Sequence, residues 1–332
     1  MFIIRNANTN DINDLYSLSQ NANLLNLPSD KDKISELIDN SLRSFETPKS
    51  KLENNYYLFC IVDQTKNKTI GVSMIHGKHG TTQKPHYFLK VDKEVKKSNS
   101  LKTEITNHTL KLGIEPNGYT EIGGLVLAPD YRGLKQKLGK QLSMSRFLYI
   151  VQHPHLFTKV IHSELLPPFD KNGKSLLWEG LGRKFLNMDY WEADLLSQQD
   201  RTFIHDLFPS STIYQNLLPQ TSVEVIGKVG ENTKPVKKML ESIGFKYTNE
   251  VDPFDGGPHY RAELIDLLPY KNFLNISGAE LKSLMMKNKN KIFLSDMTKN
   301  GEDTNDLFHA KAFKDSNIND VINEQQYNGF FI

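Results

Sequence analysis

The sequence predicts a mixed α/β (α+β) protein in which strands and helices alternate along most of the chain. Apolar, β-branched runs such as YYLFCIVD (56–63) have the length and composition of buried strands. Segments such as 27–45 instead repeat apolar residues at helical spacing. The chain has 332 residues, of which 38% are hydrophobic, so it can bury the core of one elaborate domain or of two ordinary ones.

The N-terminal part is predicted to form a strand, two helices and a hairpin. MFIIRNAN is an apolar first strand, and Asp11 stands where it can cap the helix that follows. The second helix covers 27–45, with Ser29 or Asp30 as its cap. The polar stretch QTKNK (64–68) then separates two apolar runs, which indicates a hairpin turn.

The middle of the chain alternates strands with one helix before the pattern breaks down. HYFLKVDK (86–93) is a predicted strand. A further apolar strand over 122–128 ends at a proline and leads into a helix whose apolar face begins at Leu138. KVIHSEL (159–165) is the next strand, and residues 167–222 then interrupt the alternation with prolines and short amphipathic pieces.

The alternation resumes after residue 222. VEVIGKV (223–229) is predicted as a strand, and NTKPVKKMLES (232–242) as a helix with a proline in its first turn, where proline is tolerated. FKYTNEV and HYRAELIDL are predicted strands on either side of the turn DPFDGGP. The residues from 271 onward are rich in Lys, Asn and Asp and only weakly periodic, which indicates an appendage to the core.

Composition argues against several classes of protein. The chain carries 41 Lys+Arg against 39 Asp+Glu, a net charge of +2, which does not favour a nucleic-acid partner. Its single cysteine, Cys60, cannot form an internal disulfide, so we expect a reducing compartment. No segment approaches the ~20 apolar residues of a membrane span, and the apolar start is too short for a signal peptide. We therefore expect a cytoplasmic protein without a membrane partner.

A basic, glycine-bearing turn follows the strand 122–128 and opens the next helix. Its sequence, YRGLKQKLGKQL, combines glycines that let the chain bend with cationic side chains that attract anions. The first turn of a helix also presents N–H groups without internal partners and partial positive charge. We expect a phosphate or pyrophosphate cradle here, and a solvated basic face is the alternative. The residues of this cradle are Arg132, Gly133, Lys135, Lys137, Gly139 and Lys140.

Several motifs in a fixed order carry a resemblance to a known family. They are EIGGLVLAPDYR, LLWEGLGRKFLNMDYWEAD, VIGKV, NTKPVKKMLESIGFKY and, most specifically, VDPFDGGP. Together they resemble the GNAT superfamily of acyl-CoA-dependent N-acyltransferases and, within it, the bacterial arginine N-succinyltransferase family. The resemblance implies a GNAT-like mixed, mostly antiparallel sheet flanked by helices. It also makes the cradle a site for the CoA pyrophosphate, although the spacing from Arg132 to Gly139 is stretched relative to the superfamily pattern.

The resemblance, which covers residues 1 to about 268, also divides the chain. It implies an N-terminal acyltransferase region over 1–166 and a family-specific insertion over 167–222. The C-terminal part of the acyltransferase core then covers 223–270, and an appendage of unknown role covers 271–332.

The activity that the resemblance implies is transfer of a succinyl group from succinyl-CoA to the α-amino group of L-arginine, a step of arginine catabolism. Succinyl-CoA would be a cosubstrate, with no permanently bound cofactor and no metal. The family also implies a homo-oligomer, or a hetero-oligomer with a related chain. Two alternatives stay open: a GNAT-type enzyme with another amine acceptor or acyl-CoA donor, and a weakly active CoA-binding subunit.

The family's functional residues carry over unevenly. Its succinyl-CoA contact falls on Leu125, but its proton-donor histidine falls on Gly230, which cannot transfer a proton. The candidates to replace that histidine are Glu231, His259 and Glu164, and strand alternation places Glu164 on one face with His162. Further candidates are Glu224 as a base, Asp252 and Asp255 for a cationic substrate, and Arg146, Arg183 and Lys184 for the succinyl carboxylate.

Overall fold

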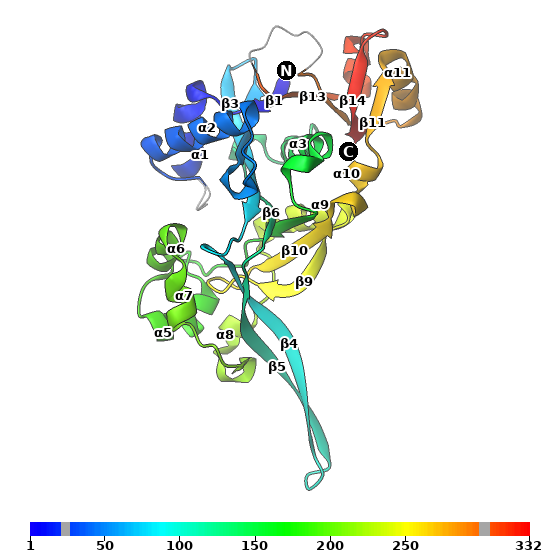
Figure 1. Ribbon diagram of the computed structural model, residues 1–332. Coiled ribbons are helices and arrows are strands. Elements are labelled where there is room, and N and C mark those ends of the chain that lie inside the picture. The colour runs from blue at the N-terminus through cyan, green and yellow to red at the C-terminus, as the bar shows by residue number, and fades with distance from the viewer. Residues whose placement is uncertain (21–26, 299–305) are drawn as a thin grey trace. The chain divides into compact units, whose positions relative to one another are not determined.

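Figure 1 shows a computed structural model of the chain, and residues 1–20, 27–298 and 306–332 are described. They form two compact units. Unit 1 comprises Met1–Lys78, Thr120–Lys159 and Glu263–Ile332, and unit 2 comprises His79–Tyr119 and Val160–Ala262. Each unit is therefore assembled from separate stretches of chain, and the division does not follow the boundaries expected from the sequence.

Unit 1 is built on a sheet with the strand order β11-β14-β12-β13-β1-β2-β3-β6. Its strands are β1 Phe2–Asn6, β2 Tyr56–Asp63, β3 Lys68–His79, β6 Tyr119–Leu127, β11 Leu274–Ser277, β12 Phe293–Asp296, β13 His309–Phe313 and β14 Gln326–Phe331. Strands β2 and β3 pair antiparallel, so the hairpin predicted from the two apolar runs is confirmed. The remaining pairs of known register in this unit are antiparallel too.

Helices cover the sheet of unit 1. They are α1 Ile12–Gln20, α2 Lys31–Glu46, α3 Leu138–Gln152, α10 Leu268–Lys271 and α11 Gly278–Lys287. Asp30 caps α2 by accepting hydrogen bonds from the N–H groups of Asp32 and Lys33, as the sequence predicted. Asp11 does not cap α1 directly. Asn8 caps a short 3-10 turn before the helix, and Asp11 completes a capping box with it.

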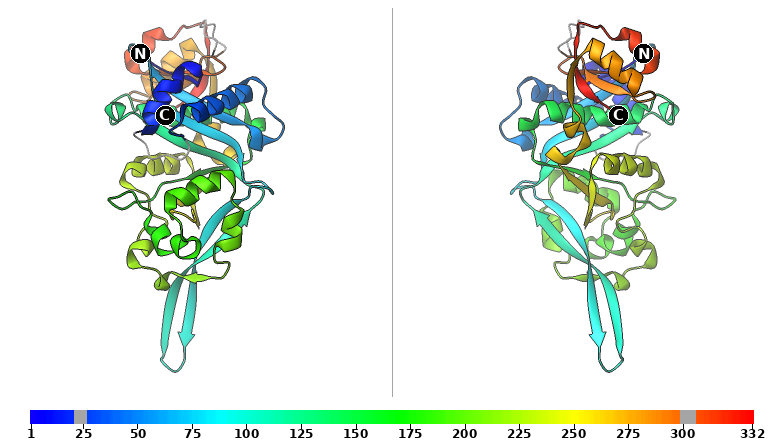
Figure 2. Two further views of the ribbon diagram at one scale, coloured as in Figure 1. Left: turned by 90° about the vertical axis from the view of Figure 1, so that its left-hand side faces the viewer. Right: turned by 90° about the vertical axis from the view of Figure 1, so that its right-hand side faces the viewer.

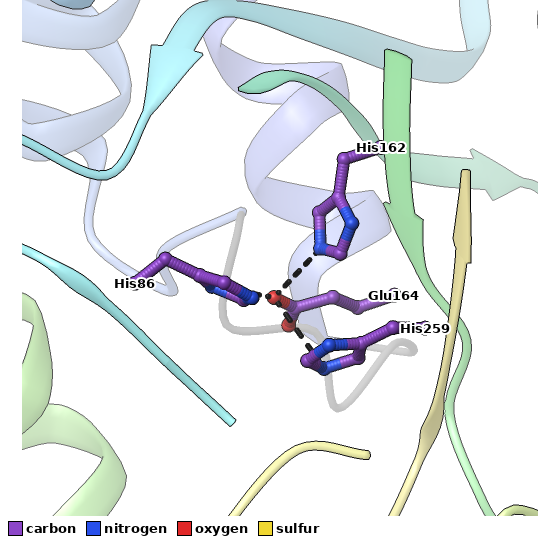
Figure 3. Close-up of side chains that lie close together, drawn as sticks. All are labelled: His86, His162, Glu164 and His259. Carbon is purple, nitrogen blue, oxygen red and sulfur yellow. Dashed lines mark hydrogen bonds and ion pairs between the residues drawn. The ribbon is translucent and has the colours of Figure 1, made fainter. Parts of the chain in front are cut away.

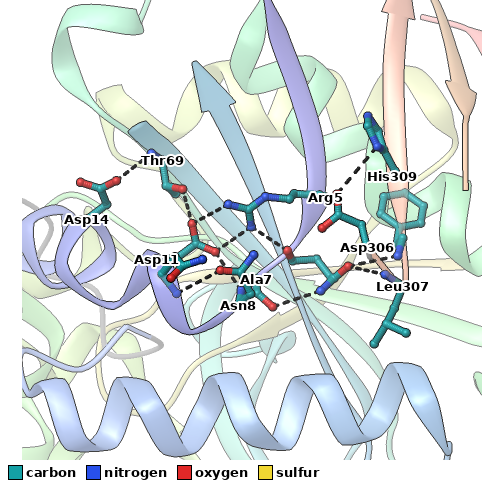
Figure 4. Close-up of polar contacts among 12 residues, drawn as sticks. Arg5, Ala7, Asn8, Asp11, Asp14, Thr69, Asp306, Leu307 and His309 are labelled. Carbon is teal, nitrogen blue, oxygen red and sulfur yellow. Dashed lines mark hydrogen bonds and ion pairs between the residues drawn. The ribbon is translucent and has the colours of Figure 1, made fainter. Parts of the chain in front are cut away.

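Polar contacts tie the C-terminal residues to the first strand of unit 1 (Figure 4). Strand β13 pairs antiparallel with β1. The side-chain oxygen of Asn6 accepts hydrogen bonds from the N–H groups of Leu307 and Phe308, at 2.8 and 3.1 Å. The residues 306–332, which we expected to belong to an appendage, therefore extend the sheet of unit 1.

Unit 2 contains a long two-stranded hairpin. Its strand order is β7-β10-β9-β4-β5-β8, with β4 His86–Ser98, β5 Thr103–Glu115, β7 Val160–Glu164, β8 Ile213–Tyr214, β9 Lys246–Val251 and β10 Pro258–Glu263. Strands β4 and β5 pair from His86↔Glu115 to Ser98↔Thr103 (Figures 1 and 2). The sequence predicted only the first part of β4, because the distal half is exposed and lacks apolar alternation.

The stretch 167–222 folds into helices of unit 2 rather than into a separate body. The helices of this unit are α4 Leu176–Gly180, α5 Gly182–Leu186, α6 Tyr190–Gln199, α7 Thr202–Leu207, α8 Gln220–Val223 and α9 Lys234–Ile243. They surround Trp178, whose ring stacks on that of Phe254 with centroids 5.0 Å apart. In the described part of the chain, no helix has the length and apolar character needed to cross a membrane.

The prediction of a strand over VEVIGKV is wrong. Helix α8 ends at Val223 and turns follow it. Val225 is buried in the core around Trp178, so its apolar character serves packing rather than strand pairing. Gly227 has a φ of +69°, which ends any extended backbone at this point.

Candidate functional site

Three histidines and one glutamate of unit 2 converge on one point (Figure 3). His86 begins β4, His162 and Glu164 lie on β7, and His259 lies on β10. Glu164 Oε1 lies 3.2 Å from His162 Nε2, so the prediction that these two side chains share a strand face is confirmed. The same oxygen lies 3.6 Å from His86 Nδ1 and 3.9 Å from His259 Nε2. These four residues form what we call the His–Glu cluster.

Neighbouring groups fix the orientation of His162. Its Nδ1 accepts a hydrogen bond from Arg261 Nε at 3.2 Å, so the ring proton lies on Nε2, which donates to Glu164. Arg261 in turn pairs with Glu250 at 2.5 Å and stacks over the ring of Tyr119, 4.1 Å from its centroid. His162 is thus held neutral and pointed at Glu164.

Burial decides the charge of the His–Glu cluster. Burial and the neighbouring histidines hold the pKa of His86 well below its usual range, and burial lowers the pKa of His162 to about 4. Burial alone would raise the pKa of Glu164. The hydrogen bond from His162 and the electrostatic interactions with the three histidines outweigh it, so this pKa lies well below its usual value. Glu164 is therefore an ionised carboxylate among imidazoles.

A second group of acidic residues interacts electrostatically with Glu164. Asp194 lies on α6, and Asp252 and Asp255 belong to the DPFDGGP turn. Asp252 accepts hydrogen bonds from the N–H groups of Phe254 and Asp255, which fixes the turn. Burial and repulsion between the carboxylates raise the pKa of Asp194 to about 7 and that of Asp252 to about 6. This concentration of carboxyl groups suits a cationic ligand.

Asp194→Asn is expected to stabilise the protein above neutral pH. The pKa of Asp194 is about 7 in the folded protein against an ordinary value of 3.8. The folded state therefore loses stability relative to the unfolded state as pH rises from about 4 through 7, because the unfolded carboxyl ionises first. The gain at pH 8 is on the order of 2 kcal/mol, because one pKa unit corresponds to about 1.4 kcal/mol and partial exposure screens part of the shift. Urea denaturation at pH 5 and pH 8 measures it. An equal or larger gain at pH 5 would contradict the assignment.

Two expected positions lie outside the His–Glu cluster. The side chain of Glu231 is 84% exposed and pairs with Lys234, so this carboxylate lacks the burial that would raise its pKa for a role as base. Gly230 has a φ of −63°, a backbone conformation open to any residue. Its N–H donates to the carbonyl oxygen of Leu166 at 2.9 Å, so Gly230 packs against the residues that directly follow β7.

The expected cradle lies in unit 1, between β6 and α3. Leu125 is partly exposed on β6, next to Gly124, whose φ of +54° bends the strand. Gly133 and Lys137, with φ of +70° and +55°, then turn the chain into α3. The exposed cradle residues are Arg132, Gly133, Lys135 and Lys137, and Gly139 and Lys140 are half-buried in the first turn of α3. In that first turn the N–H groups of Lys140 and Gln141 donate to the carbonyl oxygen of Lys137, at 2.9 and 3.0 Å, which leaves those of Leu138 and Gly139 for a ligand.

The chain has a mostly antiparallel sheet flanked by helices, and the basic turn connects β6 to α3. These features place it in the GNAT-like class of acyltransferases. The sequence model of the family described as arginine N-succinyltransferase beta subunit matches residues 2–268. The chain belongs to the arginine N-succinyltransferase family.

Individual relatives agree with that membership. The arginine N-succinyltransferase of Photorhabdus laumondii is 32% identical over 285 residues, which covers 84% of this chain and 82% of the relative. That of Yersinia pestis is 32% identical over 270 residues, covering 80% and 76%. The solved structure of arginine/ornithine succinyltransferase subunit AI from Pseudomonas aeruginosa has a TM-score of 0.78 at 21% identity, covering 100% of this chain and 98% of that one. The shared fold thus includes the C-terminal residues that the family model does not reach.

Proposed function

We propose that this chain transfers the succinyl group of succinyl-CoA to the α-amino group of L-arginine, in the cytoplasm and as part of an oligomer. The observation that carries the proposal is the family match over residues 2–268, together with relatives that bear the name arginine N-succinyltransferase. The family is that of the arginine N-succinyltransferase beta subunit, and the Pseudomonas protein is subunit AI of an arginine/ornithine succinyltransferase, which supports assembly with a second chain.

The acceptor half of the reaction needs negative charge and a proton acceptor. Arginine carries two positive charges, one on its guanidinium and one on its α-ammonium group. The ammonium must lose a proton before the nitrogen can attack the thioester carbon. Glu164, ionised and with its side chain 32% exposed, holds the ammonium group, and His259 beside it takes the proton. Asp252 and Asp255 bind the guanidinium. The new C–N bond then forms, the C–S bond breaks, and the CoA thiolate leaves.

The donor half of the reaction uses the cradle in unit 1. The cations and helix N–H groups around Gly139 hold the CoA phosphates, and Leu125 contacts the thioester arm. Arg146 supplies the cation for the free carboxylate of the succinyl group. It is 2% exposed, donates only to the Ser143 and Gly123 oxygens, and has no carboxylate partner among the described residues. Burial lowers its pKa to about 9, which a bound carboxylate would offset.

Gly139→Asp is expected to raise the Kd for CoA at least about tenfold, since an added repulsion of only ~1.4 kcal/mol suffices for that change. The new carboxylate would lie beside the proposed pyrophosphate position. The fold has room for the side chain, because the nearest atom to a Cβ at this position is Leu127 Cδ2 at 3.8 Å. Isothermal titration with CoA measures the affinity. Gly139→Ala is the matched control, with an unchanged Kd. Equal affinities for the Asp and Ala variants would place the phosphates elsewhere.

A second candidate function rests on Gly230. A glycine at the position of the family histidine fits a CoA-binding subunit that depends on a related chain for proton transfer.

The test is incubation of the purified chain with succinyl-CoA and L-arginine, with CoA release followed by thiol titration and the product identified by mass spectrometry. Succinyl-arginine formed by the chain alone supports the first proposal. Product formed only after a second chain is added supports the second.

A further inference from the structure

The donor atoms of the His–Glu cluster are arranged like the ligands of a metal ion. One ring nitrogen from each histidine and one oxygen of Glu164 all lie within 4.8 Å of one another. Ligand atoms of a tetrahedral zinc site lie roughly 3.3 Å apart, as metal–ligand distances of about 2.0–2.1 Å require. Glu164 Oε1 already lies 3.2, 3.6 and 3.9 Å from the three ring nitrogens. Small side-chain shifts would complete the geometry.

The cluster also contains buried polar atoms that nothing in the described structure satisfies. His86 and His259 are 1% and 0% exposed. Neither ring nitrogen of His259 has a hydrogen-bond partner among the described residues, and its Nε2 is the nitrogen that faces Glu164. His86 Nε2 also has no such partner, but it lies on the side of its ring away from Nδ1, the nitrogen nearest Glu164. Leaving such atoms unpaired costs free energy, and native proteins rarely do so. Three imidazoles on three strands, all turned toward one carboxylate, call for a ligand with strong affinity for nitrogen lone pairs.

We propose that His86, His162, Glu164 and His259 bind one divalent transition-metal ion of the zinc class. Imidazole nitrogens select zinc, copper, iron or nickel over magnesium and calcium, and four protein ligands fit tetrahedral zinc. The ionised Glu164 offsets one of the two charges of the ion.

A carboxylate beside the cluster is placed to orient one of the ligands, His259. Glu250 Oε2 lies 3.9 Å from His259 Nδ1, the side of the ring away from Glu164, as in carboxylate–histidine–metal arrangements. His162 must move its proton from Nε2 to Nδ1 when Nε2 binds the ion. Arg261 then gives up its hydrogen bond to Nδ1 but keeps its ion pair with Glu250 and its stacking on Tyr119.

The metal proposal does not depend on the proposed acyl transfer, although the two are compatible. If Glu164 and His259 held the ion, they would serve as its ligands, and Asp194 or Asp252 would take the proton from the acceptor amine. Loss of activity in a Glu164 variant is expected in either case, so activity does not separate the two proposals. Metal content, measured without arginine or CoA, does.

The test measures metal bound to the full chain. Protein produced in zinc-supplemented medium and passed through metal-free buffer is analysed by inductively coupled plasma mass spectrometry. We expect one zinc per chain, and on replacement by Co²⁺ the visible absorption of a four-coordinate, nitrogen-rich site. His86→Gln and His259→Gln should each lose stoichiometric metal. His205→Gln, at an exposed histidine outside the cluster, should retain it.

A second readout separates site loss from misfolding. EDTA should lower the Tm of the wild-type chain and leave the Tm of His259→Gln unchanged. Glu250→Gln keeps all four ligands and should weaken zinc affinity by about 10–100-fold, the usual effect of removing a group that orients a ligand. Absence of stoichiometric metal from the folded wild-type chain after incubation with Zn²⁺ and Co²⁺ would overturn the proposal. Equal metal content in His86→Gln, His259→Gln and wild type would do the same.

Discussion

Replacing Glu164 by glutamine is expected to lower kcat/KM for succinyl transfer to arginine by about 10²-fold or more. The variant removes the carboxylate that pairs with the ammonium group of bound arginine, and losing one partner of a hydrogen-bonded charge pair costs about 2–5 kcal/mol. Glutamine has nearly the same shape, so the strand β7 that carries it should remain intact. The loss should appear mainly with cationic acceptors, since Glu164 is the ionised carboxylate of the His–Glu cluster.

The controls for Glu164→Gln are carboxylates at the surface. Glu192→Gln, on the exposed side of α6, should leave kcat/KM unchanged. Glu231→Gln tests the other position where a proton acceptor was expected. Because Glu231 is exposed and paired with Lys234, this variant should also leave kcat/KM unchanged. Full activity in Glu164→Gln, with strong loss in Glu231→Gln, would move the acceptor site away from the His–Glu cluster.

Gly230→His is expected to raise the rate of acyl transfer, by up to the roughly 10²–10⁴-fold that general acid–base catalysis supplies. The φ of −63° at Gly230 accepts any side chain, so the strain anticipated for a left-handed glycine does not arise. A Cβ at this position would lie 2.9 Å from the carbonyl oxygen of Pro167, and because this is a backbone atom the chain must shift at a structural cost. Steady-state kinetics of CoA release measures the change.

Gly230→Ala is the matched control for that experiment. It adds the same Cβ beside Pro167 without a titratable ring, so it reports the structural cost alone. An increase in the histidine variant over the alanine variant shows that the position still faces the reacting groups. No increase, with unaltered Tm in both variants, would show that other residues have taken over proton transfer completely.

Local pattern was enough to predict most of the secondary structure that positions the site. Alternation on β7 placed His162 and Glu164 on one face, and the apolar runs predicted β2 and β3. VEVIGKV failed because its apolar residues pack in turns, where Gly227 adopts a positive φ. Burial makes a strand and a packed turn equally apolar, so periodicity over seven residues cannot separate them.

The complete His–Glu cluster was beyond prediction from sequence. His86 begins β4 and lies 76 positions before His162 in the chain, and only the pairing of strands brings them together. The family resemblance implied no metal, and a cluster assembled from β4, β7 and β10 leaves no short motif in the sequence that would indicate one. Asp194 was missed for a similar reason: its burial in α6 depends on how the helices of 167–222 pack.

The position of the succinyl group on the product tests the central claim most directly. The chain is incubated with succinyl-CoA and arginine labelled with ¹⁵N at the α-amino group, in competition with equal lysine and polyamine, and the products are fragmented in a mass spectrometer. We expect succinyl-arginine as the main product, with the succinyl group on the labelled nitrogen, and much less product when acetyl-CoA replaces succinyl-CoA. Preferential acylation of another amine, or equal turnover with acetyl-CoA, would contradict the assignment of this chain as an arginine N-succinyltransferase.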